Sequence, residues 1–266
     1  MRKEKDGLGE RLLPDEAYYG IQTLRAMENF AISDNTFAHY PNIVRAMAEI
    51  KKACALTNKE IGALPADIAD AIATACDEML AGRYPDQFPV NVFRGCGTSI
   101  NMNVNEVVAN RGNEIAGGKL LHPNDHVNMS QSSNDTFPTA MHIAAAVALE
   151  DKLLPAIDGL VETFRRLEGE NGDVVKSGRT HLQDAVPITL AQEISGWRSM
   201  LEHSRDMVTA SLDGLYELAL GGTAVGTGLN APPGFDTAAA QEVAQRTGLP
   251  FRTAPNKFHA LTSRDE

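Results

Sequence analysis

Two long stretches of helical periodicity limit most strongly what this chain can fold into. Residues 136–168 and 187–220 carry apolar side chains at spacings of three and four along their length, which is the pattern of an amphipathic helix. In the second stretch a near-heptad stripe runs through Leu190, Ile194, Trp197, Leu201, Val208, Leu212 and Leu215. Helices of that length bury such a stripe against other helices, so we expect a bundle core, with a kink or break at Pro155. A helix that binds a membrane surface or a calmodulin-like protein is the alternative.

The part of the chain before these stretches shows the same periodicity in shorter segments. Residues 42–61, 65–80 and 100–115 are predicted helices, and Gly62 and Gly82 are suitable ends for the first two. Alternating runs of Val, Ile, Thr and aromatic residues, which indicate strands, are nearly absent. We therefore predict an all-α protein with an N-terminal helical domain at 1–128 and an incomplete long-helix bundle at 129–266.

Charge and cysteine content exclude several classes of partner. The chain has 24 Lys and Arg against 35 Asp and Glu, a net charge of −11, whereas a nucleic-acid-binding face needs the opposite bias. No apolar run approaches the ~20 residues of a membrane-spanning helix, and residues 1–10 lack the apolar stretch of a secretory signal. The cysteines, Cys54, Cys76 and Cys96, form no CxxC pair, which is typical of a reducing compartment. We expect a cytoplasmic protein that binds neither nucleic acid nor membrane.

Small polar residues gather in three short segments, each directly before a predicted helix. These segments are residues 95–99 (GCGTS), 130–135 (SQSSND) and 178–184 (GRTHLQD). A helix N-terminus has unsatisfied N–H groups and partial positive charge, so hydroxyls and amides placed there can help to bind a carboxylate. Three such segments could together hold a small dicarboxylate. Helix capping is the alternative for each segment taken alone.

Patterns for other chemistries are absent or weak. The sequence has no GxxxxGK[ST] phosphate loop and no GxSxG elbow, and the glycines of residues 221–228 follow a predicted helix, which argues against a dinucleotide site. His122 and His126 are four residues apart, but Pro123 disturbs the helix that would present both to a metal. Cys96 has no evident base nearby and fits a buried thiol better than a nucleophile. We expect no metal and no cofactor.

Six stretches together resemble the fumarase/aspartase superfamily, in particular the branch that contains class II fumarase and aspartate ammonia-lyase. They are residues 17–30 (AYYGIQTLRAMENF), 97–110 (GTSINMNVNEVVAN), 122–140 (HPNDHVNMSQSSNDTFPTA), 177–193 (SGRTHLQDAVPITLAQE), 218–230 (LALGGTAVGTGLN) and 256–261 (NKFHAL). They follow the family's order through nearly the whole chain, so the chain is identified as a member of this superfamily.

The resemblance implies an assembly and a reaction. Members are homotetramers with a superhelical core of long helices, and three subunits build each active site. The implied reaction is a reversible anti elimination from a small dicarboxylate such as aspartate or malate, which leaves fumarate. A proton is removed next to a carboxylate, so the site must stabilise an aci-carboxylate dianion, which preorganised donors do.

The resemblance also implies roles for individual residues. Substrate binding falls to Cys96, Gly97, Thr98, Ser132, Ser133, Asn134, Thr180 and His181. Of these, Thr180 and His181 are the implied catalytic residues, with His181 close to the leaving group. A second, peripheral dicarboxylate site is implied at His122, Asn124 and Asp125, although Lys119 stands where fumarases carry an arginine.

The leaving group separates two activities, and the sequence carries signals for both. Residues 18–20 (YYG), Thr98-Ser99 and residues 184–187 (DAVP) resemble aspartases, whereas residues 132–135 (SSND) and 221–223 (GGT) resemble fumarases. The thiol of Cys96, a poor donor where fumarases have a serine, favours aspartate ammonia-lyase. Class II fumarate hydratase is the alternative, and a non-catalytic structural homologue is a second one.

The first testable prediction concerns the family's mobile GSSxMPxKxN loop, which supplies the serine thought to be the catalytic base and does not occur in the 266 residues. We expect the isolated 266-residue polypeptide, as part of a longer enzyme, to be inactive because nothing in it can form the carbanion. Purified polypeptide mixed with L-aspartate or L-malate should give no rise in fumarate absorbance. Robust fumarate formation would overturn this expectation.

Overall fold

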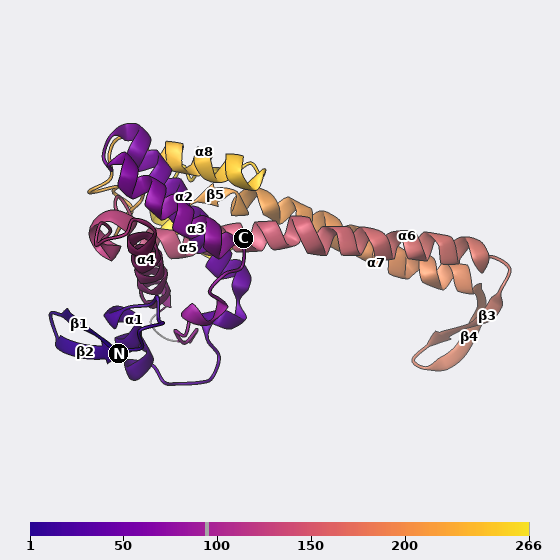
Figure 1. Ribbon diagram of the computed structural model, residues 1–266. Coiled ribbons are helices and arrows are strands. Elements are labelled where there is room, and N and C mark those ends of the chain that lie inside the picture. Colours follow the sequence, from indigo (N-terminus) through magenta and orange to yellow (C-terminus); the bar gives the residue numbers. More distant parts are fainter. Residues whose placement is uncertain (94–95, 266) are drawn as a thin grey trace. The chain divides into compact units, whose positions relative to one another are not determined.

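The computed structural model describes residues 1–93 and 96–265, with the side chain of Cys96 left out, and divides into two compact units (Figure 1). One unit combines residues 1–144 with residues 216–265, and the other comprises residues 145–215. The fold is all-α as predicted, and the described residues add three short two-stranded sheets. The predicted domain boundary at 128/129 falls inside the first unit and, as a division into family domains, stays a prediction.

Four helices build the core of the first unit around α2. Helix α2 (Pro41–Ile61) packs against α3 (Ala66–Leu80) and α8 (Phe235–Thr247), and α3 packs against α4 (Cys96–Ile115). Met47, Ile50 and Ile72 are fully buried in this core, as their helical spacing predicts. Gly62 ends α2 in the left-handed conformation (φ 81°), where a side chain would be strained. The division between the two units falls within the residue range of helix α5 (Ser133–Ala148).

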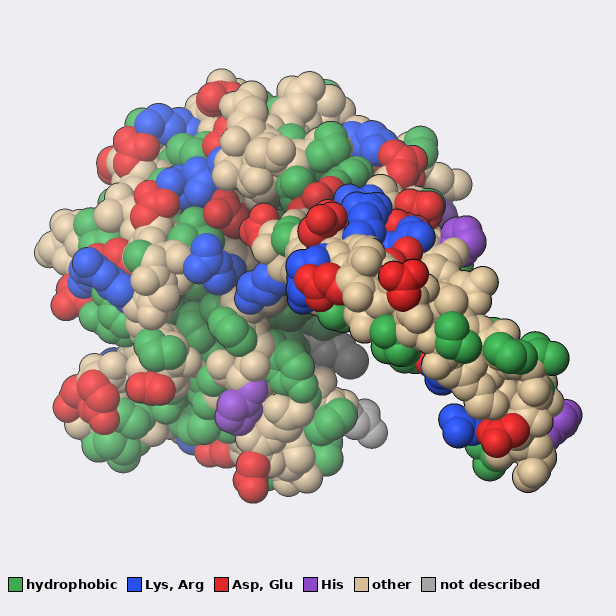
Figure 2. All heavy atoms as spheres, turned by 90° about the vertical axis from the view of Figure 1, so that its right-hand side faces the viewer, with side chains coloured by type: hydrophobic (Ala, Val, Ile, Leu, Met, Phe, Trp, Pro, Cys, Tyr) green, Lys and Arg blue, Asp and Glu red, His purple; other side chains and the backbone are tan. Residues whose placement is uncertain are grey.

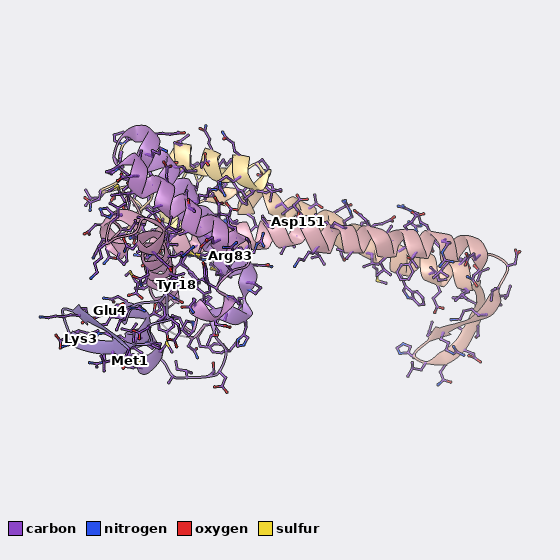
Figure 3. The ribbon with its side chains drawn as sticks, in the orientation of Figure 1. Met1, Lys3, Glu4, Tyr18, Arg83 and Asp151 are labelled. Carbon is purple, nitrogen blue, oxygen red and sulfur yellow. The ribbon has the colours of Figure 1, made fainter. Side chains whose placement is uncertain are left out.

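Short elements complete the first unit at both ends of the chain. Strands β1 (Arg2–Asp6) and β2 (Gly9–Leu13) form an antiparallel hairpin, on which Met1, Lys3 and Glu4 are labelled in Figure 3. Helix α1 (Ile21–Asn29) follows, and the single turns η1 (Phe37–His39), η2 (Pro85–Gln87) and η3 (Pro123–Val127) connect the helices. Strand β5 (Glu217–Leu218) pairs in parallel with β6 (Arg252–Thr253), and α9 (Lys257–Thr262) comes after it.

A buried carboxylate holds the start of α1 against α4. Glu106, 3% exposed, accepts hydrogen bonds from the backbone N–H groups of Gly20, Gln22 and Thr23 and from the Thr23 hydroxyl, at 2.7–3.0 Å. A negative group at a helix N-terminus satisfies N–H groups that have no partner inside the helix. The approach requires glycine at position 20, because a Cβ there would lie 2.7 Å from the carboxylate.

The second unit is a pair of long helices joined by a β-hairpin. A π-helical turn, η4 (Leu149–Leu153), leads into α6 (Leu154–Glu170), which packs against α7 (Leu190–Leu215). Ion pairs connect the two helices, including Arg198 Nε to Glu168 Oε1 at 2.6 Å. On the face seen in Figure 2, Lys and Arg side chains lie among Asp and Glu side chains. Trp197, Met200 and Met207 remain between 44% and 68% exposed, so this helix pair leaves part of its apolar surface uncovered.

One detail of the predicted long helices is confirmed and another is wrong. The first helix is interrupted next to Pro155 as predicted: the π-helical turn η4 comes directly before Leu154, and Pro155 lies in the first turn of α6, where its missing N–H is tolerated. The second helix starts at Leu190 and ends at Leu215, since residues 183–189 form β4 (Gln183–Thr189), paired with β3 (Val175–Thr180). In the described part of the chain, no helix combines the length and hydropathy that a membrane crossing requires.

The Glu106 contact generates a stability prediction. In Glu106→Gln an amide NH₂ replaces one acceptor oxygen and faces N–H donors, so we expect the free energy of unfolding to fall by about 2 kcal/mol. Urea unfolding of the 266-residue chain measures the change, with Glu60→Gln at an exposed position of α2 as the matched control. Equal unfolding free energies for the two variants would contradict the assigned role of the carboxylate.

Candidate active site

Two helix N-termini meet where the sequence places its first two polar segments. Helix α4 begins at Cys96 and α5 at Ser133, as the segments predict. The hydroxyls of Thr98 and Ser133 lie 3.1 Å apart. Gly97 allows this approach, because a Cβ there would lie 2.6 Å from the Cβ of Phe137. The partial positive charges of the two helix N-termini and the two hydroxyl groups therefore lie close together.

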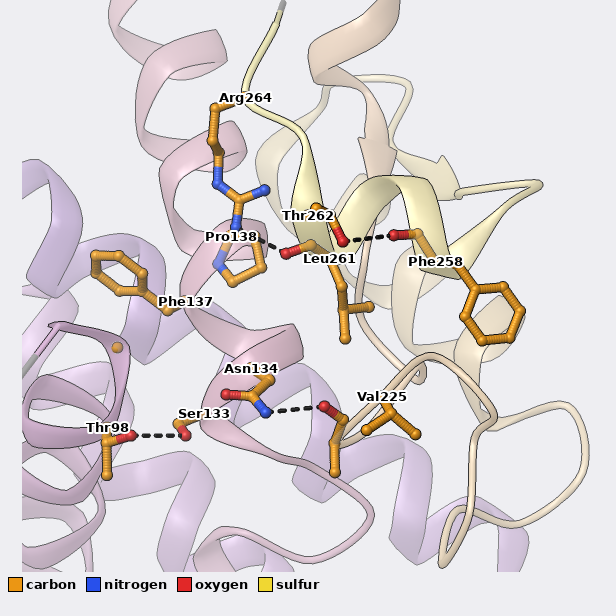
Figure 4. A pocket seen from close by; sticks show the side chains of 12 residues that line it. Thr98, Ser133, Asn134, Phe137, Pro138, Val225, Phe258, Leu261, Thr262 and Arg264 are labelled. Carbon is orange, nitrogen blue, oxygen red and sulfur yellow. Dashed lines mark hydrogen bonds between the residues drawn. The ribbon is translucent and has the colours of Figure 1, made fainter.

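Two adjoining cavities open at this meeting point. One, of about 440 Å³, is lined by Thr98, Ser133, Asn134 and, farther along, Phe258 and Arg264 (Figure 4). The other, of about 380 Å³, shares Thr98 and Ser133. Its remaining polar lining comes from Asn101, Asn128, Ser130, Gln131, Ser132, Thr223, Thr227 and Asn230. Asn134 is tied to the 221–228 segment, since its Nδ2 donates to the Ala224 carbonyl at 2.8 Å (Figure 4).

The carboxylate of Asp135 joins the two segments that form these walls. Asp135 is fully buried, and its Oδ1 accepts from the Ser132 N–H at 2.9 Å. Its Oδ2 accepts from the N–H groups of Gly221 and Thr223 at 3.1 and 2.8 Å. Burial raises the pKa of Asp135 to about 6, although these hydrogen bonds oppose the rise. One side chain thus fixes the serine segment against the glycine-rich segment.

The third polar segment does not precede a helix, which corrects the prediction. Thr180 and His181 lie where β3 turns into β4, in the unit of residues 145–215, and both are exposed. His181 and Leu182 make the turn with positive φ values of 48° and 63°. Val175 and Ser177 in β3, and Val186 and Ile188 in β4, are each two residues apart, which is the spacing of side chains on one face of a strand. The sequence prediction missed this signal because each segment is short. The other predicted binding residues, Gly97, Thr98, Ser132, Ser133 and Asn134, line the two cavities together, and the side chain of Cys96 lies outside the described residues.

The predicted peripheral site occupies a single turn. His122 precedes η3, and its Nδ1 accepts from the Asp125 N–H at 3.2 Å, while Asn124 is exposed in the same turn. The His122 N–H donates to the Nδ1 of His126 at 3.0 Å, so both imidazoles accept hydrogen bonds from backbone N–H groups of this turn. Among residues 1–93 and 96–265, no three His, Cys, Asp or Glu side chains gather as a metal site would require.

Sequence reasoning missed the buried polar groups behind the cavities. The roles of Asp135 and Thr223 depend on contacts across more than 80 residues, which no local pattern announces. Lys51 had a detectable signal, because it lies four residues after Met47 and three before Cys54 on the apolar face of α2. A lysine on such a face, 0% exposed, needs partners. It finds them in Asn101, Asn128 and Gln131.

Comparison with known proteins assigns the chain to a family of lyases. The family model described as lyase matches residues 9–266, and the chain belongs to the fumarase/aspartase superfamily of lyases. Class II fumarate hydratases of Campylobacter jejuni and Thermus thermophilus are both 52% identical to it, over 99% and 100% of this chain respectively. The chain spans 58% of the length of each of these relatives.

Solved structures give the same family. A Brucella melitensis structure described as fumarate lyase:delta crystallin bound to cobalt matches with a TM-score of 0.95 and 42% identity, covering 99% of this chain and 58% of the other. A class II fumarase from Schistosoma mansoni matches with a TM-score of 0.94 and 40% identity, covering 97% and 58%. The predicted superfamily and fold class are confirmed, and the relatives carry the name of the alternative activity, not that of aspartate ammonia-lyase.

The raised pKa of Asp135 generates a pH prediction. The folded protein holds this proton up to about pH 6, and the unfolded chain only to about pH 4. Between those values the folded state binds more protons, so the contribution of Asp135 to the free energy of unfolding falls as pH rises from about 4 to about 6, by about 2–3 kcal/mol, and is constant above.

Urea unfolding from pH 4 to pH 7 measures this contribution as the difference in slope between the unsubstituted chain and Asp135→Asn, which has no carboxyl to titrate. Asp34→Asn at an exposed position is the control and should keep the original slope. The prediction is wrong if Asp135→Asn keeps that slope as well.

Proposed function

We propose that the protein containing this chain is a class II fumarate hydratase, which interconverts L-malate and fumarate. The observation that carries the proposal is the convergence of Thr98 and Ser133 from two helix N-termini on one cavity wall, in a chain about half identical to proteins of that name. The aspartase-like residues 18–20 and 184–187 keep aspartate ammonia-lyase as the second candidate.

The cavity walls suit a dianionic substrate. The hydroxyls of Thr98, Ser132 and Ser133 can donate to carboxylate oxygens, and Asn134 is held in place by the 221–228 segment to orient the molecule. Removing a proton next to a carboxylate moves charge onto that carboxylate, and preorganised donors stabilise it without reorganisation. Cys96 and Gly97 belong to the same binding segment in this proposal.

Other copies of the chain complete the site in this proposal. Thr180 and His181 stand on an exposed hairpin whose turn residue Leu182 is 91% exposed. Helix α7 of the same unit leaves apolar side chains uncovered, which is a surface for association. We assign the hairpin to a neighbour's active site in a homotetramer, where His181 acts near the leaving hydroxyl. His122, Asn124 and Asp125 form the proposed second dicarboxylate site.

The proposal predicts which substrate is turned over. The protein purified as its gene encodes it should form fumarate from L-malate and not from L-aspartate, followed by absorbance. Ser133→Ala should lower kcat/KM for malate by about 100-fold, because it removes one donor from the developing charge. Thr74→Ala, at an exposed position of α3, should change it less than about twofold. Activity on aspartate alone would establish the second candidate instead.

A further inference from the structure

Lys51 is a buried cation whose partners in the described part of the chain are all neutral. It lies in α2 with 0% of its surface exposed. Its Nζ donates to Asn101 Oδ1 at 2.6 Å, to Gln131 Oε1 at 2.8 Å and to Asn128 Oδ1 at 3.1 Å. An ammonium has three protons, so three amide oxygens use all of its donors. The hydrogen bonds are complete, but no described residue gives the charge a direct counter-ion.

This arrangement fixes the loop that leads into Ser132. Because an ammonium only donates, all three amide oxygens face it, and their nitrogens are free to bind elsewhere. Gln131 Nε2 donates to the carbonyls of Val127 and Met129 at 3.1 and 3.0 Å. Asn128 Nδ2 donates to the Gln131 carbonyl at 3.3 Å. The loop folds around these amides, and their orientation depends on the lysine.

The same amides separate Lys51 from the candidate site. Asn101, Asn128 and Gln131 line the cavity of about 380 Å³ together with Ser132 and Ser133. The positive charge therefore lies one layer of side chains behind the wall. In a poorly screened interior such a charge acts across that distance.

Burial lowers the pKa of Lys51 to about 8, and the negative charge of the nearby Asp135 opposes this fall, so the group is largely charged at neutral pH. Burial raises the pKa of both thiols, that of Cys76 to about 12, so they are neutral there. Asp135 is the one negative group of this set, and it already accepts from three backbone N–H groups. Burying the charge of Lys51 lowers the stability of the fold. A dicarboxylate in the cavity would bring further negative charge near this cation.

We propose that Lys51 is a positioning residue of the dicarboxylate site, which holds the loop that presents Ser132 and Ser133 and supplies a fixed positive charge behind them. The inference rests on the proposed function and deepens it, because it adds to the site a positive charge that lies outside the three polar segments. Lys51 does not touch the substrate; it acts through the amides.

The test uses the protein as its gene encodes it, with Lys51→Met and Lys51→Gln. Methionine keeps the length without donor or charge, and glutamine keeps hydrogen bonding without charge. Lys59→Met is the matched control, on the same helix but paired with Asp70 at the surface. Calorimetry gives the dissociation constant of succinate, an unreactive dicarboxylate, steady-state kinetics with L-malate give kcat and KM, and circular dichroism reports folding.

We expect the succinate dissociation constant and the KM for malate to rise by about tenfold in both Lys51 variants, as for one charge acting through a partly screened interior. The kcat at saturation should change less than threefold. A loss of folded enzyme would give the opposite pattern, because it lowers kcat and leaves the dissociation constant unchanged. Lys59→Met should stay within twofold throughout.

Two results would overturn the inference. One is a folded Lys51 variant that binds succinate within twofold of the unsubstituted protein. The other is failure of both Lys51 variants to fold, which would make the residue structural. If the unsubstituted protein itself neither binds succinate nor acts on malate, the proposed function falls, and the inference with it, and this result is visible before any variant is made.

Discussion

The close contact between the N-termini of α4 and α5 is the constraint on which the rest of the site depends. Gly97 permits it, since any side chain there would collide with Phe137. Once the two helix starts are in contact, the hydroxyls of Thr98 and Ser133 lie 3.1 Å apart and both cavities open beside them. Helix N-termini attract anions, so the place where the backbones meet is also where a carboxylate is favoured.

Buried charge then fixes the walls around that contact. Asp135 binds backbone N–H groups of two distant segments, and Lys51 binds amide oxygens on α4 and on the loop before α5. Each buried charge costs free energy that apolar side chains of the same size would not. Complete hydrogen bonding offsets part of this cost and gives the segments a single arrangement. A binding site needs such order, because a carboxylate is bound by hydrogen-bond donors that are held in fixed positions.

The two units differ in how far their side chains are buried. The first is a packed core in which the buried side chains of Lys51, Glu106 and Asp135 are hydrogen-bonded, and it carries the cavities. The second is a pair of helices with an exposed hairpin and uncovered apolar side chains such as Met200 and Met207. A helix pair alone cannot cover both faces of each helix, so its stripe is suited to contact with other helices. The proposed assembly of several copies uses that surface.

The sequence by itself determined helices α2 to α6 and most of α7, the superfamily and the two polar segments at the starts of α4 and α5, because periodicity, glycine stops and hydroxyl clusters act over a few residues. It did not predict α1, α8 or α9. It misassigned residues 178–184, where the hairpin depends on pairing between β3 and β4 that a short polar run conceals. Only the tertiary structure decided that Lys51 meets Asn101 and Gln131, and that Asp135 meets Gly221 and Thr223. These partners lie 50 to 88 residues apart in the chain. Packing of whole helices brings them together, and no local pattern of side chains carries that information.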